Sequence, residues 1–166
     1  DSGGVMVIVY AVKGFDGANL PLDNPLQVPA HRYSGRVLAS GKEAVRTTPK
    51  FERGRLLGDV VFVSGTAAIK GEDSEFSEDT RVQALGAIDV VEHLVAPSNI
   101  SPNCSAFRFG YLRVYVRRPQ DLEPVREMFI SHFRDTPIHF LQADICRPEL
   151  LLDLEGVGRA LPFLKP

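Results

Sequence analysis

Tryptophan is absent from this sequence, and cysteine is rare. The sequence also has no long apolar run and no large excess of either charge. Two cysteines, Cys104 and Cys146, are too few for a disulfide framework or a four-cysteine zinc site. We therefore expect a reduced, cytoplasmic protein. The eight-residue apolar run Val5–Val12 falls short of the ~20 residues that span a bilayer, and no basic region precedes it. We expect neither a membrane partner nor a signal peptide.

Net charge and missing motifs exclude several classes of function. The formal net charge is −2, whereas proteins that bind duplex nucleic acid usually carry a basic excess. The sequence has no Gly-x-x-x-x-Gly-Lys loop, no Gly-x-Gly-x-x-Gly, no His-Glu-x-x-His and no Gly-x-Ser-x-Gly. Its four histidines do not have the spacing of metal ligands. We therefore predict no metal and no cofactor, and we do not expect nucleic acid as a partner.

What is present is the composition of one ordinary globular domain. The chain has 166 residues, of which 44% are hydrophobic and 24% charged. This length favours a single domain over residues 1–166. Residues 14–50 are dense in glycine and proline, which predicts loops and short strand pieces. We expect this segment to be an irregular loop or arm, able to reach a neighbouring subunit.

Hydrophobic periodicity predicts strands, a helix, a strand, a helix and two closing strands. The ranges are Val5–Val12 and Asp59–Gly65 (strands), Phe76–Ser98 (helix), Phe109–Arg117 (strand), Pro119–Arg134 (helix), and Phe140–Ile145 and Leu150–Glu155 (strands joined by a turn at Cys146–Glu149). Ser77 is the predicted cap of the first helix. Its predicted apolar stripe is Val82, Leu85, Ile88, Val91 and Val95.

This order of elements is an α+β pattern with two helices on one face of a sheet. Two helices cannot cover both faces of the sheet. We therefore predict that self-association covers the other face.

Several segments resemble known families. Phe62–Thr66, a helix containing Gln83, and Leu112–Val116 before a second helix resemble the YjgF/Rid family. Three further segments resemble the C-terminal half of chorismatases. They are Asn24–Gln27, Pro49–Arg53, and Ala143–Arg147 leading to Leu151–Gly156. The resemblance covers about residues 5 to 158.

The resemblance implies a chorismate-mutase-like (YjgF/Rid-like) mixed sheet and a homotrimer with three ligand sites in clefts between subunits. Rid proteins include enamine and imine deaminases, and some members were named endoribonucleases or translation inhibitors. Chorismatases cleave or rearrange chorismate and release pyruvate. The partner implied for this chain is therefore a small carboxylate metabolite. Two positions depart from the family patterns: deaminating Rid proteins have arginine where His139 stands, and chorismatases have glutamate where Asp153 stands.

The candidate catalytic residues are Asp153, Glu155 and Cys146. Cleavage of an enol ether needs a carboxylic acid that stays protonated near neutrality. Asp153 and Glu155 are two positions apart on one predicted strand, so they share a face and one pKa is raised by the other. Cys146 resembles the cysteine of the hydroxybenzoate-forming chorismatases. The structural alternatives are two solvent-facing carboxylates and a small buried hydrophobic cysteine.

The candidate ligand-binding residues are arginines, a histidine, a tyrosine and a strand-ending turn. Arg147 suits a carboxylate through two parallel hydrogen bonds, and Arg53 and Arg117 are further candidates. The remaining candidates are His139, Ser64, Gly65, Thr66, Arg113 and Tyr115. Each has a structural alternative: a surface arginine, a histidine packed beside Phe140, a polar sheet face, or a plain turn.

Three functions remain open at this point. The first is a lyase or hydrolase acting on a chorismate-like or enamine/imine acid, with Asp153 or Glu155 as the acid and Arg147 as the anchor. The second is a binding module without catalysis, which the departures at His139 and Asp153 favour. The third is an endoribonuclease, against which the near-neutral charge counts.

Overall fold

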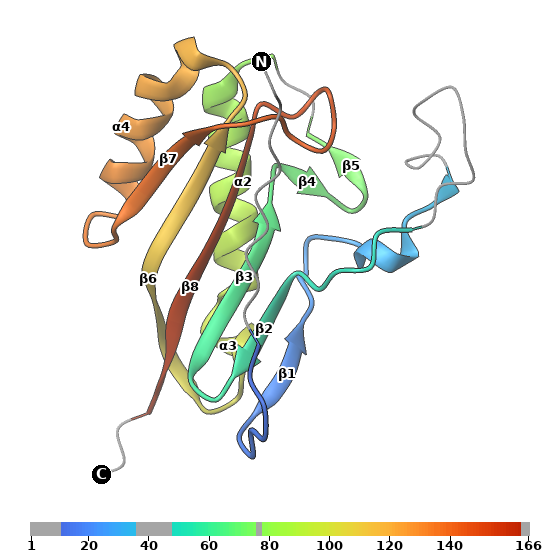
Figure 1. Ribbon diagram of the computed structural model, residues 1–166, viewed down its shortest axis with the longest axis vertical. Coiled ribbons are helices and arrows are strands. Elements are labelled where there is room, and N and C mark those ends of the chain that lie inside the picture. Colours follow the sequence, from blue (N-terminus) through green and yellow to red (C-terminus); the bar gives the residue numbers. More distant parts are fainter. Residues whose placement is uncertain (1–10, 36–47, 76–77, 164–166) are drawn as a thin grey trace.

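The computed structural model describes residues 11–35, 48–75 and 78–163 of the chain. A mixed sheet of six strands forms its centre, in the order β1-β2-β3-β8-β6-β7 (Figure 1). The strands are β1 (Asn19–Leu22), β2 (Gly54–Leu57), β3 (Val60–Thr66), β6 (Cys104–Val116), β7 (Ile138–Gln142) and β8 (Leu152–Pro162). All neighbours are antiparallel except β6 and β7, which are parallel.

Smaller elements surround this sheet. The helices described in full are α2 (Thr80–Leu94), α3 (Pro97–Ile100) and α4 (Leu122–His132), with 3-10 turns at Ala30–Arg32 and Pro119–Asp121. A short hairpin of β4 (Ile69–Lys70) and β5 (Asp73–Ser74) stands apart from the main sheet. Parallel strands need a crossover connection, and α4 supplies it between β6 and β7.

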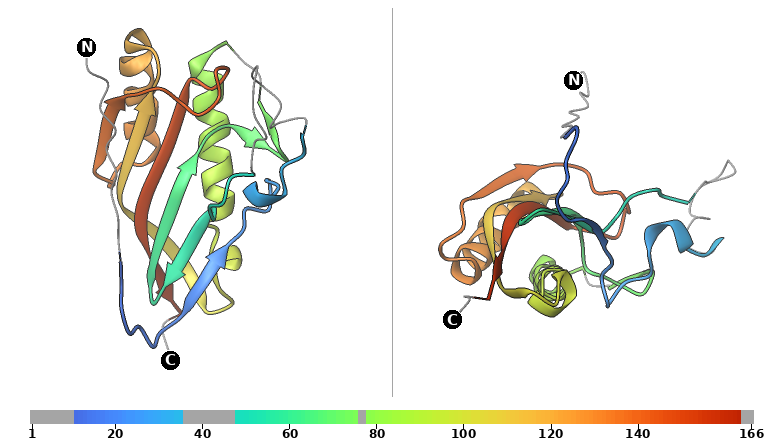
Figure 2. Two further views of the ribbon diagram at one scale, coloured as in Figure 1. Left: turned by 45° about the vertical axis from the view of Figure 1, so that its right-hand side comes forward. Right: turned by 90° about the horizontal axis from the view of Figure 1, so that it is seen from below.

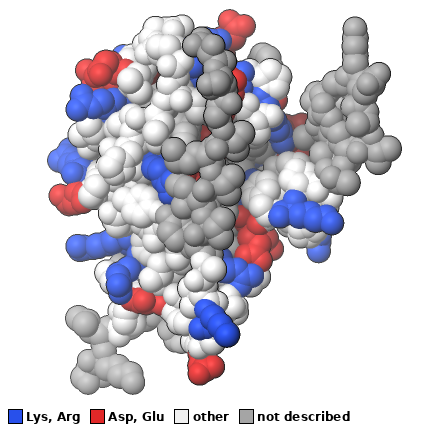
Figure 3. All heavy atoms as spheres, viewed as in Figure 1, with Lys and Arg blue, Asp and Glu red and all other residues white. Residues whose placement is uncertain are grey.

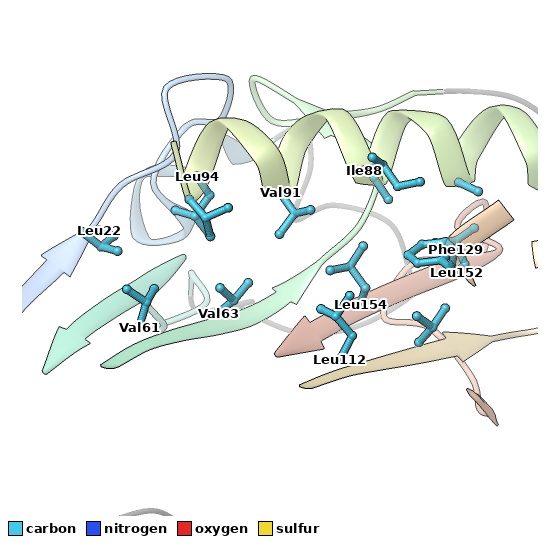
Figure 4. Close-up of a cluster of buried hydrophobic side chains, with 14 of the residues drawn as sticks. Leu22, Val61, Val63, Ile88, Val91, Leu94, Leu112, Phe129, Leu152 and Leu154 are labelled. Atoms are coloured by element: carbon cyan, nitrogen blue, oxygen red, sulfur yellow. The ribbon is translucent and has the colours of Figure 1, made fainter. Parts of the chain in front are cut away.

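Helices α2 and α4 lie on one face of the sheet, as expected (Figure 2). Leu94, Val91 and Ile88 point from α2 toward the strand residues of the core (Figure 4). Val114 and Leu154 are fully buried beneath the helices. Alternate residues of each strand face the helices, so the intervening residues lie on the opposite, open face.

The predicted apolar stripe of α2 is only partly right. Ile88, Val91 and Val95 are buried, but Val82 and Leu85 are 52% and 59% exposed. The residues of the helix that pack in the core against the sheet are Ala84, Ala87, Ile88, Val91 and Leu94. Small alanines let the helix axis approach the sheet closely, whereas a stripe of larger residues would hold it away.

The ends of α2 also differ from the expectation. The helix begins after Asp79, whose side chain accepts a hydrogen bond from the backbone N–H of Arg81 at 2.8 Å. Asp79 therefore caps it, while the expected cap, Ser77, lies outside the described residues. The helix ends at Leu94, and Pro97 begins α3 instead of closing α2.

The two closing strands are present but are not neighbours. Strand β7 pairs with β6, and β8 lies between β3 and β6. Residues 143–151 therefore form a crossing loop, longer than the expected four-residue turn. Sequence proximity suggested a hairpin, but the long antiparallel pairing of β6 with β8 takes precedence.

The early segment contains the short strand pieces that its composition predicts. Strand β1 forms an edge of the sheet beside β2, and the side-chain amide of Asn24 donates to the carbonyl oxygen of Val90 at 2.8 Å. The expected strand Val5–Val12 falls largely on residues 1–10, which lie outside the described part of the chain, as do residues 36–47.

Candidate functional site

The open face of the sheet carries two cross-strand rows of polar side chains. Residues directly opposite in neighbouring strands point to the same face. Arg113 of β6 stands between Glu155 of β8 and His139 of β7. In the adjacent row, Tyr115 of β6 stands opposite Asp153. The topology thus brings together residues from three strands.

A bulge in β3 closes one end of these rows. Three residue steps in β3, from Val63 to Thr66, oppose two steps in β8, from Gly156 to Leu154. The extra residue falls at Ser64–Gly65, beside Asp153. A Cβ at position 65 would lie 3.0 Å from one carboxylate oxygen of Asp153, so a larger residue here would require the carboxyl group to shift. Bulges of this kind commonly re-aim side chains next to functional sites.

Asp153 is half-buried against this bulge. Its Oδ1 accepts a hydrogen bond from the backbone N–H of Leu154 at 2.8 Å. Burial raises the pKa of Asp153 from 3.8 to about 7, and the neighbouring charge of Glu155 adds to this rise. Hydrogen bonds from the backbone and the positive charge of Arg53 act in the opposite direction without cancelling it. Close to neutral pH, Asp153 can therefore hold or release a proton.

Glu155 has a different environment. Its Oε1 accepts a 2.5 Å hydrogen bond from the hydroxyl of Tyr115 and lies 3.2 Å from Nε of Arg113. Burial and this bond to Glu155 raise the pKa of Tyr115 to about 12, so the phenol keeps its proton. The two carboxyl groups expected to share a face do so, but one is ion-paired and the other desolvated.

The crossing loop holds Cys146 and Arg147 beside the sheet. Arg117 donates from Nη2 to the carbonyl oxygens of Ile145 and Arg147 at 2.7 and 2.9 Å. Buried Gln83 of α2 donates to the carbonyl of Glu149 and accepts from the N–H of Leu151, each at 2.8 Å. Arg117, a candidate for binding a ligand carboxylate, therefore holds the crossing loop in place through these hydrogen bonds.

Cys146 is exposed and free. Desolvation of the thiol and the nearby Asp153 carboxyl raise the pKa of Cys146. A thiol with a raised pKa is a poor nucleophile near neutrality, because the thiolate is the reactive form. The thiol thus suits contact with a ligand better than covalent catalysis.

The guanidinium of Arg147 points toward the β4–β5 hairpin. Its Nη1 donates to the carbonyl of Glu72 at 2.9 Å and to Oγ of Ser74 at 3.0 Å. It also lies 5.3 Å from the ring centre of Tyr33. The arginine whose positive charge lowers the pKa of Asp153 is Arg53, not Arg147. Arg53 is buried and also lies against the Tyr33 ring.

The residues of the turn Ser64-Gly65-Thr66 lie on different faces of the sheet. Thr66 is buried opposite Leu154, and its hydroxyl donates to the carbonyl of Ser64 at 2.8 Å. The hydroxyl of Thr66 therefore braces the bulge, whereas its backbone forms a hydrogen bond with Asp153 that opposes the rise of the Asp153 pKa. Ser64 lines an open pocket of about 540 Å³ over β2 and β3, with Lys50, Phe51 and Phe62 among the other lining residues.

Comparisons with known proteins agree with this architecture. No model of a protein family matches the chain. Over 169 aligned residues the chain is 32% identical to the 3-hydroxybenzoate synthase of Streptomyces hygroscopicus, covering 93% of this chain and 47% of that protein. It is 29% identical to a chorismatase of Streptomyces rapamycinicus, again over 93% of this chain and 47% of the relative. The chain thus spans about half the length of the curated relatives that it matches.

Solved structures place the fold. A chorismatase crystal structure superposes with a TM-score of 0.73 at 28% identity, covering 85% of this chain and 44% of the chorismatase chain. The Rid-family protein YyfA of Yersinia pestis superposes with a TM-score of 0.60 at 10% identity, covering 87% of this chain and all of that protein. The chain has a Rid-like fold close to that of chorismatases. The expected fold class and the expected resemblance are both confirmed.

Within this Rid-like fold, the open face gathers most of the expected site residues. Asp153, Glu155, Arg113, Tyr115 and His139 lie on it, and Ser64 and Gly65 border it. Sequence reasoning missed Tyr33, which contacts two arginines. Tyr33 sits in the segment predicted as an irregular arm, and no periodic pattern marks it.

The described residues contain no group of three or more His, Cys, Asp or Glu side chains placed to hold a metal ion. On the open face, basic and acidic side chains are interspersed among the coloured residues, with no block of positive charge (Figure 3). None of the helices in this part of the chain is long and apolar enough to cross a membrane.

Proposed function

We propose that this chain forms the catalytic unit of a chorismatase-like lyase or hydrolase, which binds a chorismate-like acid on the open sheet face and protonates it from Asp153. The observation that carries this proposal is the difference between two carboxyl groups on one strand. Glu155 is held by Arg113 and Tyr115, while Asp153 has a pKa of about 7. When two carboxyl groups have different environments, the one with the raised pKa can act as the acid while the other stays ionised.

The chemistry follows from the proton on Asp153. Transfer of this proton to the methylene carbon of an enol ether produces an oxocarbenium ion. Water then adds to that cation, and the resulting hemiketal releases the ring alcohol and pyruvate. Of the two protons of this water, one returns to Asp153 on addition and restores the acid, and the other passes to the leaving alcohol when the hemiketal collapses. A pKa near the working pH serves both steps.

Arginines and histidine supply the binding of the acid groups. Arg147, the expected anchor, keeps one buried guanidinium nitrogen, Nη2, without a hydrogen-bond partner. His139 and Arg113 are cross-strand neighbours at the other side of the open face. Cys146 would contact the substrate next to Asp153, as the raised pKa of its thiol favours.

The proposal includes binding sites between subunits of a homotrimer. Among the described residues, no helix covers the open face, and Leu141 in β7 leaves 39% of its surface exposed there. Association of copies through this face would exclude water from Asp153 and complete a cleft around it. Exclusion of water strengthens electrostatic interactions inside a site.

A binding module without catalysis is the second candidate. The observations that favour it are the shorter Asp153 and the His139 side chain, both of which depart from the patterns of the resembling enzymes. A carboxyl group displaced by one methylene can lose orders of magnitude in rate. The same geometry would still bind a small acid.

Turnover of chorismate separates the two candidates. The purified full chain is incubated with chorismate while pyruvate is followed, and with an enamine generated in situ while ammonia is followed. We expect pyruvate release that Asp153→Asn lowers by at least about 100-fold, the usual contribution of a general acid. Asp135→Asn, at an exposed position, is the matched control and should leave the rate unchanged.

Each other outcome has a defined meaning. Saturable binding of chorismate without pyruvate or ammonia would replace the enzyme by the binding module. If the enamine releases ammonia and Asp153→Asn stops this release, Asp153 remains the proposed acid but the substrate is an enamine or imine acid. Turnover that is equal in wild type and Asp153→Asn would remove Asp153 from the mechanism.

A further inference from the structure

Gln83 of α2 is a polar side chain inside the core. It is 1% exposed, and it is the one polar member of the twelve largest fully buried side chains in the described part of the chain. It belongs to the buried residues of α2 together with Ala84 and Ala87. Burying a side-chain amide costs free energy unless the amide is hydrogen-bonded, and an apolar residue would fill the same space without that cost. The amide therefore needs a reason other than packing.

The amide of Gln83 pairs with the backbone of the crossing loop, as a peptide group of a neighbouring strand would. Its Nε2 donates to the carbonyl oxygen of Glu149 and its Oε1 accepts from the N–H of Leu151, each at 2.8 Å. Leu150, between these two residues, is fully buried. Buried backbone groups need hydrogen-bond partners, and Gln83 supplies two of them from a helix that is distant in the sequence.

These two hydrogen bonds fix the start of β8, the strand that carries Asp153. Leu151 comes directly before β8 and two residues before Asp153. Asp153 lies so close to the bulge that a Cβ at Gly65 would be 3.0 Å from its carboxylate oxygen. A shift at the start of β8 would therefore move this carboxyl group either against the bulge or away from it.

The crossing loop also carries Cys146, whose thiol responds to the position of the loop. Desolvation and the nearby carboxyl of Asp153 raise the pKa of this thiol. Gln83 holds the end of the loop next to β8, and Arg117 holds the part next to Cys146. The ionisation of Cys146 therefore reports where the loop lies relative to Asp153, and it does so without a substrate.

We propose that Gln83 is a positioning residue of the candidate site, which fixes the crossing loop and the start of β8 so that Asp153 stays against the bulge and Cys146 stays beside it. The inference rests on the proposed function for the role of Asp153 as the acid. Gln83 acts through two backbone groups from the helix side of the sheet, so it takes no part in the chemistry itself. Small displacements of a reacting group can cost about 100-fold in rate.

Gln83→Met tests this role, because methionine has a similar length but makes neither hydrogen bond. Alkylation of Cys146 by iodoacetamide across a range of pH gives the midpoint of thiol ionisation, and mass spectrometry separates it from buried Cys104. We expect the midpoint to lie above the ordinary thiol value in the wild type. In Gln83→Met it should be about one pH unit lower, because the loop moves away from Asp153.

Leu94→Ala is the matched control for a general loss of stability. Leu94 is buried at the opposite end of α2 from Gln83, so its truncation destabilises the same helix without removing a bond to the loop. We expect this variant to keep the wild-type thiol midpoint.

Turnover of chorismate provides the second measurement. We expect the kcat of Gln83→Met, corrected for the folded fraction, to fall about 100-fold, the effect of a displaced acid. The pH above which turnover declines should also fall, because a displaced Asp153 is less desolvated. Leu94→Ala should keep the wild-type kcat in its folded fraction.

The outcomes separate this inference from the proposed reaction. If the wild type releases neither pyruvate nor ammonia, the proposed function fails and the thiol midpoint alone decides the role of Gln83. An unchanged midpoint in folded Gln83→Met, an equal fall in Leu94→Ala, or a wild-type kcat in Gln83→Met would overturn the inference. If Gln83→Met does not fold by circular dichroism, Gln83→Asn takes its place, because its shorter amide cannot reach both backbone groups.

Discussion

At the scale of single residues, the protonation of Asp153 depends both on the sequence and on the surroundings of the side chain. A carboxyl group two positions from another on a strand is visible in the sequence, but its pKa depends on what surrounds it. Here Asp153 lies against the bulge at Gly65 and burial raises its pKa, while Glu155 is held by Arg113 and Tyr115. The same functional group, a carboxyl, thus acquires different chemistry at two nearby positions of one strand.

The raised pKa of Asp153 predicts a dependence of stability on pH. Between pH 4 and 7 the folded chain holds a proton on Asp153 that the unfolded chain has released, because the pKa rises from 3.8 to about 7 on folding. The stability that this group contributes below pH 4 is therefore lost as the pH rises through 7. A shift of about three units corresponds to roughly 4 kcal/mol at most.

Denaturant unfolding at pH 5 and pH 8 measures this effect. We expect the free energy of unfolding to fall between these two values in the wild type and to fall less in Asp153→Asn, which cannot titrate. Glu78→Gln, at an exposed site, serves as the control. Identical pH profiles for the wild type and Asp153→Asn would show that the carboxyl group titrates in the ordinary range. Turnover should decline above pH 7 for the same reason.

At the scale of elements, helix α2 shows how sequence periodicity can mislead. Its sequence contains apolar residues on more than one side, and the predicted stripe selected the larger ones, including Val82 and Leu85. The structure instead buries the side with Ala84 and Ala87, because these small residues let the helix pack closely on β3 and β8. Helical periodicity shows that a stripe exists, but the volume available above the sheet decides which one is used.

Two leucines of this helix provide a matched test. Leu94 is fully buried and Leu85 is 59% exposed. Leu94→Ala should lower the free energy of unfolding by about 2–5 kcal/mol, because it leaves a cavity in the core. Leu85→Ala should change it by about 0.5 kcal/mol or less. Urea unfolding of both variants measures the difference, and similar losses in the two would contradict the observed orientation of α2.

At the scale of the whole molecule, the sheet face that none of the described helices covers sets the expected assembly. The order β1-β2-β3-β8-β6-β7 leaves Leu141 exposed on the edge strand β7, beside the polar rows of the candidate site. Our proposal places this face between the subunits of a homotrimer. Burial of the face would protect the protonated form of Asp153.

Light scattering after size exclusion tests this assembly. We expect three copies at micromolar concentration, and we expect Leu141→Glu to lower the mass toward that of one copy, because it buries a charge at the contact. Leu85→Glu adds the same charge on the helix side and should leave the mass unchanged. A stable monomer of the wild type would refute the assembly and remove the proposed shelter of the site.

The sequence by itself determined the fold class, the strand at β3, the alternation of β6, and the positions of two helices. These features depend on local periods of two and 3.6 residues. It also determined that Asp153 and Glu155 share a face, because that follows from their spacing on one strand. The resemblance to chorismatases came from short segments such as Ala143–Arg147.

Only the tertiary structure decided which carboxyl group is desolvated and which arginines lie near it. Strand β8 enters between β3 and β6, so the expected terminal hairpin does not form and the crossing loop brings Arg147 to Tyr33. Tyr33, Arg53 and Arg147 come from distant segments, and no local pattern links them. Desolvation depends on every neighbour in space, and for this reason the chemistry of Asp153 appears only in the folded chain.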